Sequence, residues 1–372
     1  MKQILNVTFR TSFVCFLALF LQLAGCSQNK KPEKFHTNKN VPVRPSISEI
    51  RGPANGSVFK CGETIPINFI IKNNTVSIDS IVISSGSYLL KTYKTDFNKI
   101  AWPTINAPVG QNILKITTCY NDSLKDNKSV VVTLLSNIIP KLYKFHLIHT
   151  YHHDPEAFTQ GLIYDNGTLL ESTGQNGHSS LRRVEITTGK VLDIVNLDAK
   201  YFGEGIALIQ NKIYQITWKA QTGFIYDKKT FDVLRTFDFP YYEGWGLTSH
   251  ENNLYMTDGT SFVYVIEPEY FTQKRQIDVL NHKGRVTQLN ELEYVHGKIL
   301  ANVLGESYIV VIDPANGKVT GELELKRLIP KGMEGEINKV LNGIAYNKET
   351  NHFYVTGKLW PVLYEIEIEG EL

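Results

Sequence analysis

The sequence predicts an all-β protein, a five-bladed β-propeller preceded by a small immunoglobulin-like β-sandwich domain. Two observations carry this prediction: a strand–turn–strand pattern recurs five times in the second part of the chain, and short alternating strands fill the first. The composition agrees, because 19 Tyr, 18 Phe and 27 Gly in 372 residues suit many strands joined by tight turns. The formal net charge of +2, without a dense basic stripe, gives no support for nucleic-acid binding.

The N-terminal residues have the pattern of a targeting segment followed by a tether. A positively charged start precedes an apolar run, Ser12 to Leu23, that is too short to span a bilayer comfortably. Small residues then precede Cys26, which resembles a bacterial lipoprotein signal; the alternative is an ordinary cleaved signal with an incidental cysteine. We expect residues 1–25 to be the signal peptide and Cys26 the lipidated residue. Residues 26–45 would be a flexible tether that holds the protein at the bacterial cell envelope, facing the periplasm or the exterior.

Residues 46–138 are expected to form the sandwich domain. Four runs alternate or are continuously apolar, and turn signals such as Asn-Gly and Asp-Asn separate them. These runs are 65–71, 77–83, 110–116 and 129–134. Cys61 and Cys119 would lie near an early and a late strand, so they either form a disulfide or remain as two buried free thiols. We expect a spacer or docking role for this domain, because it shows no cluster of metal-ligating residues.

Residues 142–372 carry the repeats. Each repeat consists of a small residue, an apolar strand, a polar turn and a second strand, except that Glu291 replaces the small residue in the fourth. The repeats start at Gly161, Gly205, Gly246, Glu291 and Gly343. The starts lie 44, 41, 45 and 52 residues apart, which is the period of a four-stranded propeller blade. The last repeat has three strands only. Residues 143–148, just before the first repeat, are expected to supply its fourth strand and so to close the sheet edge.

This topology predicts where a ligand binds. The first strand of each hairpin starts, and its antiparallel partner ends, on the same face. The residues before the five starts are therefore expected to form an inner ring: Gln160, Glu204, Trp245, Asn290 and Asn342. The ends of the second strands are expected to surround it: Thr173, Trp218, Asp258, Leu304 and Lys358.

Glu204 is the carboxylate of the inner ring and stands between Gly203 and Gly205. Glycines on both sides allow a sharp turn, and we expect them to leave room for a bound molecule. The alternative is a structural ion pair, for example with a lysine or with the Arg182–Arg183 pair. Lys358 would be interpreted, from its position alone, as an exposed rim lysine.

Several motifs in order resemble the plant-type glutaminyl cyclases (glutamine cyclotransferases), five-bladed propellers that also occur in bacteria. The resemblance covers about residues 142–372. The motifs are Phe158-Thr159-Gln160-Gly161, Phe202-Gly203-Glu204-Gly205, Glu243-Gly244-Trp245-Gly246-Leu247, Leu289-Asn290-Glu291-Leu292-Glu293 and Gly357-Lys358-Leu359-Trp360-Pro361. The resemblance implies conversion of an N-terminal glutamine of a peptide or protein to pyroglutamate with release of ammonia.

The resemblance also implies roles for individual residues. Glu204 matches the acid/base, and Gln160, Asn290 and Lys358 match polar residues suited to orienting the amide and stabilising the oxyanion. An aromatic wall would hold the substrate and exclude water; its residues are Phe158, Phe202, Trp218 and Trp245. Leu304 stands where the family usually has Trp, which predicts altered affinity or pocket size. Asn342 is included as a substrate-binding residue from its place in the ring.

No organic cofactor is implied, and a structural cation on the propeller axis is compatible with the family. The adjacent His152 and His153 are interpreted as part of a solvated loop, because neighbours on an extended strand point to opposite faces. We expect a monomer that acts on Gln-initiated peptides and reaches the membrane through its lipid anchor. The competing hypothesis is a non-catalytic propeller that binds peptide N-termini or glycans. Metal-dependent lactonase-type hydrolysis is disfavoured, because the two rings hold too few metal ligands.

Overall fold

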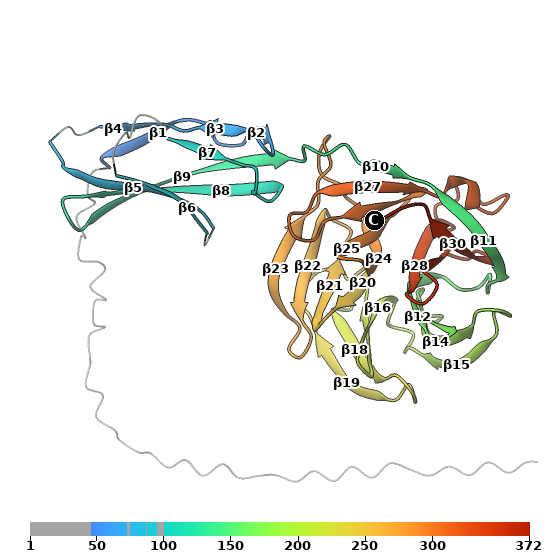
Figure 1. Cartoon of the computed structure of the whole chain (residues 1–372). Helices are drawn as coiled ribbons and strands as arrows, with labels where there is room; N and C mark the ends of the chain where they lie inside the picture. Colours follow the sequence, from blue (N-terminus) through green and yellow to red (C-terminus); the bar gives the residue numbers. More distant parts are fainter. Residues whose placement is uncertain (1–45, 73–74, 87, 95–99) are drawn as a thin grey trace, which may run out of the picture. The chain divides into compact units, whose positions relative to one another are not determined.

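The computed structural model describes residues 46–72, 75–86, 88–94 and 100–372, which form an all-β structure (Figure 1). Their one helical segment is a turn of 3-10 helix, η1 (Lys326–Leu328). A helix long and apolar enough to cross a bilayer is absent from these described ranges. The predicted signal peptide, Cys26 and the tether lie outside them.

Residues 48–135 form three sheets around an apolar core. The largest has the strand order β2-β9-β8-β5-β6, and two small sheets pair β1 with β4 and β3 with β7. The bounds are β1 (Ser48–Gly52), β2 (Ser57–Lys60), β3 (Thr64–Pro66), β4 (Asn68–Ile71), β5 (Ile78–Ser85), β6 (Tyr88–Tyr93), β7 (Ala101–Pro103), β8 (Gly110–Tyr120) and β9 (Leu124–Leu135). The strand expected over 65–71 is divided, because the N–H of Ile67 donates to the carbonyl of Ile100 between β3 and β4.

Cys61 and Cys119 are both free thiols, so the disulfide alternative is wrong. Alternate side chains of a strand point to opposite faces of the sheet. On β8, Ile116 and Thr118 are buried on the core side, whereas Cys119 is only half-buried and belongs to the other face. Cys61 lies in the core, where its thiol contacts the carbonyl of Ala107 at 3.6 Å. The two sulfurs therefore lie on different faces of the sheet.

Residues 141–368 form five sheets, each built from an antiparallel meander (Figure 1). The first three contain four consecutive strands each: β12 (Thr159–Asp165), β13 (Thr168–Thr173), β14 (Ser180–Glu185) and β15 (Val191–Asn196); β16 (Gly203–Ile209), β17 (Lys212–Thr217), β18 (Thr222–Asp227) and β19 (Val233–Asp238); β20 (Leu247–His250), β21 (Asn253–Thr257), β22 (Phe262–Glu267) and β23 (Thr272–Asp278). The fourth contains β24 (Leu289–Val295), β25 (Lys298–Val303), β26 (Tyr308–Ile312) and β27 (Val319–Glu324). The fifth begins with β28 (Leu341–Asn347), β29 (His352–Gly357) and β30 (Val362–Ile368).

The strand before the first repeat joins the last sheet, as predicted. β11 (Phe145–His152) pairs antiparallel with β30 and becomes the fourth strand of the fifth sheet. The predicted segment also included Tyr143, which belongs instead to β10 (Lys141–Tyr143) and pairs parallel with β27 of the fourth sheet. β11, which precedes β30 by more than 200 positions in sequence, thus covers what would otherwise be the exposed edge of β30.

The first strands of the five sheets contact one another in order. β12 contacts β16, β16 contacts β20, β20 contacts β24, and β24 contacts β28, which in turn contacts β12. Small residues make these approaches close: a Cβ atom on Gly205 would collide with the backbone of Gly246 and Leu247, and one on Gly246 with the backbone of Asn290. The recurring glycine is therefore required because neighbouring inner strands touch through their backbones.

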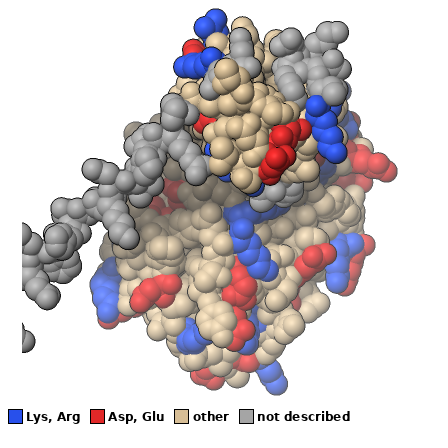
Figure 2. Space-filling view, turned by 90° about the vertical axis from the view of Figure 1, so that its left-hand side faces the viewer, with Lys and Arg blue, Asp and Glu red and all other residues tan. Residues whose placement is uncertain are grey.

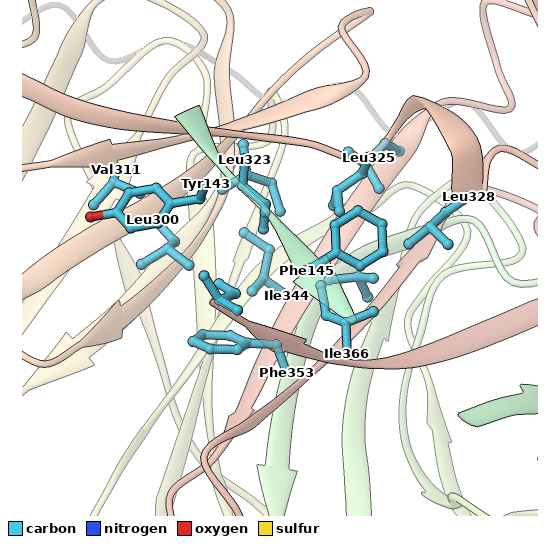
Figure 3. Packing of buried hydrophobic residues seen from close by; sticks show 14 of the residues in the cluster. Tyr143, Phe145, Leu300, Val311, Leu323, Leu325, Leu328, Ile344, Phe353 and Ile366 are labelled. Carbon is cyan, nitrogen blue, oxygen red and sulfur yellow. The ribbon is translucent and has the colours of Figure 1, made fainter. Parts of the chain in front are cut away.

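An apolar cluster fixes the fourth and fifth sheets to β10 and β11 (Figure 3). Leu300 and Ile344 are fully buried in it, and Tyr143 and Phe145 pack against them. Trp360 belongs to the same cluster, is fully buried, and donates its indole N–H to the carbonyl of Lys339 at 2.8 Å. The turn after β29 is thereby anchored in the core.

On the face in Figure 2, cationic and anionic side chains are intermixed, without a concentrated patch of one sign.

Candidate active site

Four polar side chains of the predicted inner ring are presented by β-bulges. The pairing between first and second strands shifts register at the positions of Gln160, Glu204, Asn290 and Asn342. A bulge gives two residues on one strand for one on its partner and redirects a side chain. The same irregularity in four sheets thus places an amide or a carboxylate at equivalent positions. In the third sheet, Trp245 lies two residues before the start of β20, and Gly246 stands between them.

Glu204 is buried, with 4% of its surface exposed. Within the described chain, no group donates a hydrogen bond to its carboxylate. Burial raises the pKa of Glu204 well above its ordinary value, the charge of Lys358 opposes this shift, and the charge of Glu243 adds to it. The arginine alternative is wrong, because Arg182 pairs with Glu171 and Asp154 and Arg183 pairs with Asp165 and Asp193. Glu204 is therefore a buried carboxyl group with a raised pKa, which suits a group that exchanges a proton.

Lys358 is also buried, with 5% of its surface exposed, so its interpretation as an exposed rim lysine is wrong. Its backbone N–H donates to the carbonyl of Val340 at 2.9 Å, and its Nζ lies 4.8 Å from the centre of the Phe158 ring. Burial lowers the pKa of Lys358, and the nearby Glu204 opposes that change. The amino group of Lys358 therefore lies against an aromatic face and is close enough to Glu204 for the two charges to interact.

The ring amides are joined to one another and leave polar atoms without protein partners. Asn342 Nδ2 donates to the carbonyl of Thr159 at 2.9 Å and to Gln160 Oε1 at 3.2 Å. This contact leaves Gln160 Nε2 as the group available to donate. Among the described residues, nothing donates to the buried Oδ1 atoms of Asn290 and Asn342. Buried polar atoms without partners in a functional site indicate places for a ligand or a water molecule.

The predicted aromatic wall is assembled, and we use that term for Phe158, Phe202, Trp218 and Trp245. The ring centres of Phe158 and Phe202 are 5.9 Å apart and those of Phe202 and Trp218 5.6 Å apart, both edge to face. Phe158 is buried, and the other three are half-buried.

Leu304 is half-buried at the end of the second strand in the fourth sheet, where its N–H donates to the carbonyl of Gln288 at 2.8 Å.

Glu243 completes the wall and was not among the predicted site residues. Its Oε2 accepts a hydrogen bond from the indole N–H of Trp218 at 2.9 Å and from that of Trp245 at 2.8 Å. Its other oxygen lies 3.4 Å from Nζ of Lys219. A signal was present in the sequence, because Glu243 precedes Trp245 by the same two positions as Phe202 precedes Glu204.

The expected position of Thr173 is displaced by one residue. The N–H of Trp218 donates to the carbonyl of Phe202, and the equivalent bond in the first sheet is donated by Gly174 to the carbonyl of Phe158. Gly174 therefore occupies the position that we assigned to Thr173. A Cβ atom there would collide with the Phe202 ring, so this glycine makes room for the wall. The room that we expected Gly203 to leave for a ligand is also taken, because a Cβ on Gly203 would lie 2.7 Å from the carbonyl oxygen of Thr173.

His153 is buried, which contradicts its assignment to a solvated loop; His152 is exposed as expected. His153 Nδ1 lies 2.8 Å from the carbonyl oxygen of Trp360, and its Nε2 lies 3.0 Å from Glu171 Oε1. The charge of Glu171 raises the pKa of His153 against the effect of burial. The sequence misleads here because the partner carboxylate comes from β13, a separate strand.

Glu171 is the centre of this polar network. The same oxygen that contacts His153 accepts a 2.6 Å hydrogen bond from Thr159 Oγ1, and its second oxygen accepts one from Arg182 Nε at 2.9 Å. Thr159 precedes Gln160, and Trp360 follows Lys358 by two residues. The network therefore connects the backbone that carries Gln160 to the turn that carries Lys358. Over the described ranges, His, Cys, Asp and Glu form no group of three or more arranged to hold a metal ion.

Comparison with known proteins identifies the family. A sequence profile described as "Glutamine cyclotransferase" matches residues 118–368. The chain is 38% identical over 237 residues to an Arabidopsis thaliana glutaminyl-peptide cyclotransferase; the match covers 62% of this chain and 72% of the plant protein. It also resembles the crystal structure of a Myxococcus xanthus glutaminyl cyclase, with a TM-score of 0.58 and 32% identity over 62% of this chain and 98% of that one. The chain belongs to the glutamine cyclotransferase family.

Proposed function

We propose that this protein is a glutaminyl-peptide cyclotransferase, which converts the N-terminal glutamine of a peptide or protein to pyroglutamate and releases ammonia. The observation that carries the proposal is the buried, unpaired carboxyl group of Glu204, which a β-bulge places close to Lys358. The family match supplies the reaction class. Substrate chemistry and the site are complementary, because the reaction needs one proton carrier and donors for a developing oxyanion.

The first step is ring closure. The substrate's free α-amine attacks the carbon of its own side-chain amide, a C–N bond forms, and the carbonyl π electrons move to oxygen. The ionised Glu204 takes a proton from the attacking nitrogen. A free α-amino group has a pKa of about 8. A carboxylate with a raised pKa is therefore a better base for this proton transfer than a carboxylate with the usual pKa of Glu. We assign stabilisation of the oxyanion to Lys358 Nζ and to the side-chain amide of Asn290.

The second step is release of ammonia. Protonated Glu204 returns its proton to the amide nitrogen, the bond between that nitrogen and carbon breaks, and the oxyanion electrons restore the carbonyl group. Ammonia leaves, Glu204 is ionised again, and water is not consumed. One carboxyl group therefore serves as base and then as acid.

The ring amides suit the substrate's carboxamide. Its NH₂ group has two N–H donors, and Asn290 Oδ1 and Asn342 Oδ1 are acceptors that lack a donor within the described chain. Gln160 Nε2 is oriented as a donor by the bond from Asn342 to its oxygen. The aromatic wall packs against the aliphatic part of the substrate and keeps water from the reacting atoms. The substrate's side chain is in this way held near its own amine.

The test is a coupled ammonia assay with a Gln-initiated dipeptide. Wild-type protein should release ammonia, and Glu204→Gln, which keeps the side-chain size, should lower kcat by at least about 100-fold, the scale of a lost acid–base catalyst. Glu306→Gln is the control, because Glu306 is an exposed acid on another loop. An unaltered rate in Glu204→Gln contradicts the role of Glu204. Tight dipeptide binding by wild-type protein without ammonia release would instead favour the non-catalytic binding module.

We further propose that the five sheets are the blades of a β-propeller, which the order of contacts between their first strands supports. We propose that the three sheets of residues 48–135 are an immunoglobulin-like spacer. The pattern before Cys26 supports a lipid-anchored location at the bacterial cell envelope. Labelling with a radioactive fatty acid, lost in Cys26→Ser, would test the anchor.

A further inference from the structure

Two of the four tryptophans of the chain share one acceptor atom. Both indole N–H groups donate to Glu243 Oε2, Trp218 from the end of the second sheet's hairpin and Trp245 from the start of the third. A carboxylate accepts stronger hydrogen bonds than a neutral group does. A single side chain thus fixes the ring orientation of two residues from different sheets, and both rings are only half-buried.

We propose that Glu243 is a positioning residue of the active site, which holds the two indole rings of the aromatic wall in the orientation that receives the substrate glutamine. This inference rests on the proposed function and explains what keeps two residues of the aromatic wall in place. Without Glu243, both indole N–H groups would lose the shared acceptor that fixes the orientation of their rings. Substrate positioning is sensitive to such changes, since a displacement of about 1 Å can cost 100-fold in rate.

Lys219 keeps Glu243 in place and charged. Its Nζ lies 3.4 Å from Glu243 Oε1 and 3.9 Å from the centre of the Trp218 ring. The two indole bonds and Lys219 lower the pKa of Glu243 despite partial burial. The carboxylate is therefore ionised at neutral pH, so Oε2 carries no proton and can accept from both indole N–H groups.

The charge of Glu243 has a second effect on the same site. Two charged groups act on Glu204: Lys358 favours its ionised form, and Glu243 disfavours it. Neighbouring carboxyl groups whose pKa values are shifted in opposite directions can divide two tasks between them. Here Glu204 carries the proton, whereas Glu243 stays ionised and holds the wall.

Two substitutions separate the two effects. Glu243→Gln keeps an oxygen that can accept from both indoles but removes the charge, so KM should stay within about threefold of wild type. The acid limb of the pH profile of kcat/KM should move to lower pH, because the pKa of Glu204 falls. Glu243→Ala removes the acceptor as well, and kcat/KM should fall on the order of 10-fold to 100-fold, mainly through KM. Glu306→Ala is the matched control and should behave as wild type.

A double-mutant cycle tests the contact itself. In a Trp218→Phe, Trp245→Phe background the indole donors are gone, so Glu243→Ala should raise KM by a much smaller factor than in wild type. The same factor in both backgrounds overturns the proposal, as does an unchanged KM in folded Glu243→Ala. Circular dichroism confirms that each variant is folded.

A measurement without turnover keeps this inference separate from the proposed function. Acrylamide quenching of tryptophan fluorescence in the free protein should increase in Glu243→Ala and stay near wild type in Glu243→Gln. If wild type releases no ammonia, the proposed function fails, while increased quenching in Glu243→Ala still supports the role of Glu243 in holding the two indole rings. Unchanged quenching in Glu243→Ala contradicts that role, whether or not the protein releases ammonia.

Discussion

The backbone N–H of Gly205 donates a 2.7 Å hydrogen bond to the carbonyl oxygen of Trp245. This bond joins the second sheet to the third immediately beside Glu204. It forms because Gly205 carries no side chain: a Cβ atom there would lie 2.7 Å from the same carbonyl oxygen. The acid/base residue is thus held by a contact between sheets.

Gly205→Ala should therefore destabilise the protein. The added methyl group must displace backbone atoms of the next sheet, and overpacking of this kind costs about 1–3 kcal/mol. We expect a lower midpoint in urea unfolding monitored by circular dichroism, together with reduced ammonia release. A midpoint equal to that of wild type would show that the two sheets can separate locally at no cost.

Glu204→Gln should raise stability while it removes activity. The pKa of Glu204 is higher in the folded state than in the unfolded state, because the carboxyl group is buried. Ionisation of this group therefore favours the unfolded state, and the free energy of unfolding falls as pH rises through the folded-state pKa. Gln has no such charge, so the variant should gain free energy of unfolding, about 0.5–2 kcal/mol at pH 7.5. The gain should vanish below the ordinary pKa of 4.5, where both states of wild type are protonated. Urea unfolding at pH 4 and pH 7.5 compares the two conditions.

Lys358→Met should shift the pH profile in the direction opposite to Glu243→Gln. Lys358 stabilises the ionised form of Glu204, so its removal raises the pKa of that carboxyl group further. The acid limb of kcat/KM should move to higher pH, and kcat should fall by 100-fold or more if Lys358 stabilises the oxyanion. Shifts of the same sign in both variants would be incompatible with the proposed electrostatics.

Leu304→Trp should strengthen substrate binding. Leu304 is half-buried at a second-strand end, and the resemblance described above implies Trp at this position. An added aromatic contact contributes about 0.5–1.5 kcal/mol, so KM should fall roughly twofold to tenfold. Steady-state kinetics with a Gln-initiated dipeptide measures it. A higher KM would mean that Leu304 makes space for a larger substrate.

Glu171→Ala should be among the most damaging substitutions. It leaves the buried Arg182 and His153 without their shared carboxylate, and breaking a buried ion pair costs about 3–5 kcal/mol. The His153 contact also gives wild type a pH dependence: its pKa is raised above 6.5, so its stabilisation is complete below that value and is lost as pH rises through the folded-state pKa.

Replacing the histidine isolates that contribution. His153→Asn should reduce the loss of stability between pH 6 and pH 9, measured by urea unfolding. The exposed neighbour offers a matched control, since His152→Asn should leave the curve unchanged. Equal curves for wild type and His153→Asn would contradict the charged contact.

The sequence predicted much of the site because the site repeats with the fold. The spacing of the starts placed Gln160, Glu204, Asn290 and Asn342 at equivalent positions, and the structure has each of them in a bulge. Repeat alignment failed by one residue at Thr173, because Gly174 supports the ring of Phe202 from the next sheet.

Contacts between separate strands escaped prediction. Nothing in the sequence around His153 indicates that its partner is Glu171. The positions of Cys61 and Cys119 allowed a disulfide, but the side chain of Cys119 lies on the face of β8 that points away from the core, so the bond does not form. Glu243 belongs to one of the motifs found in the sequence. Its contacts with Trp218 and Trp245 could not be predicted, because these two residues come from different sheets.

The sequence by itself determined the all-β class, the fivefold repetition, the strand that closes the last sheet and the positions of the polar ring, because these follow from periodicity along one chain. Tertiary structure decided the raised pKa of Glu204, the burial of Lys358 and the connection from Gln160 to Lys358 through Glu171. The physical reason is that burial and charge–charge interactions depend on which side chains meet in space. These contacts depend on how the sheets pack against one another, and they produce no periodic pattern in the sequence.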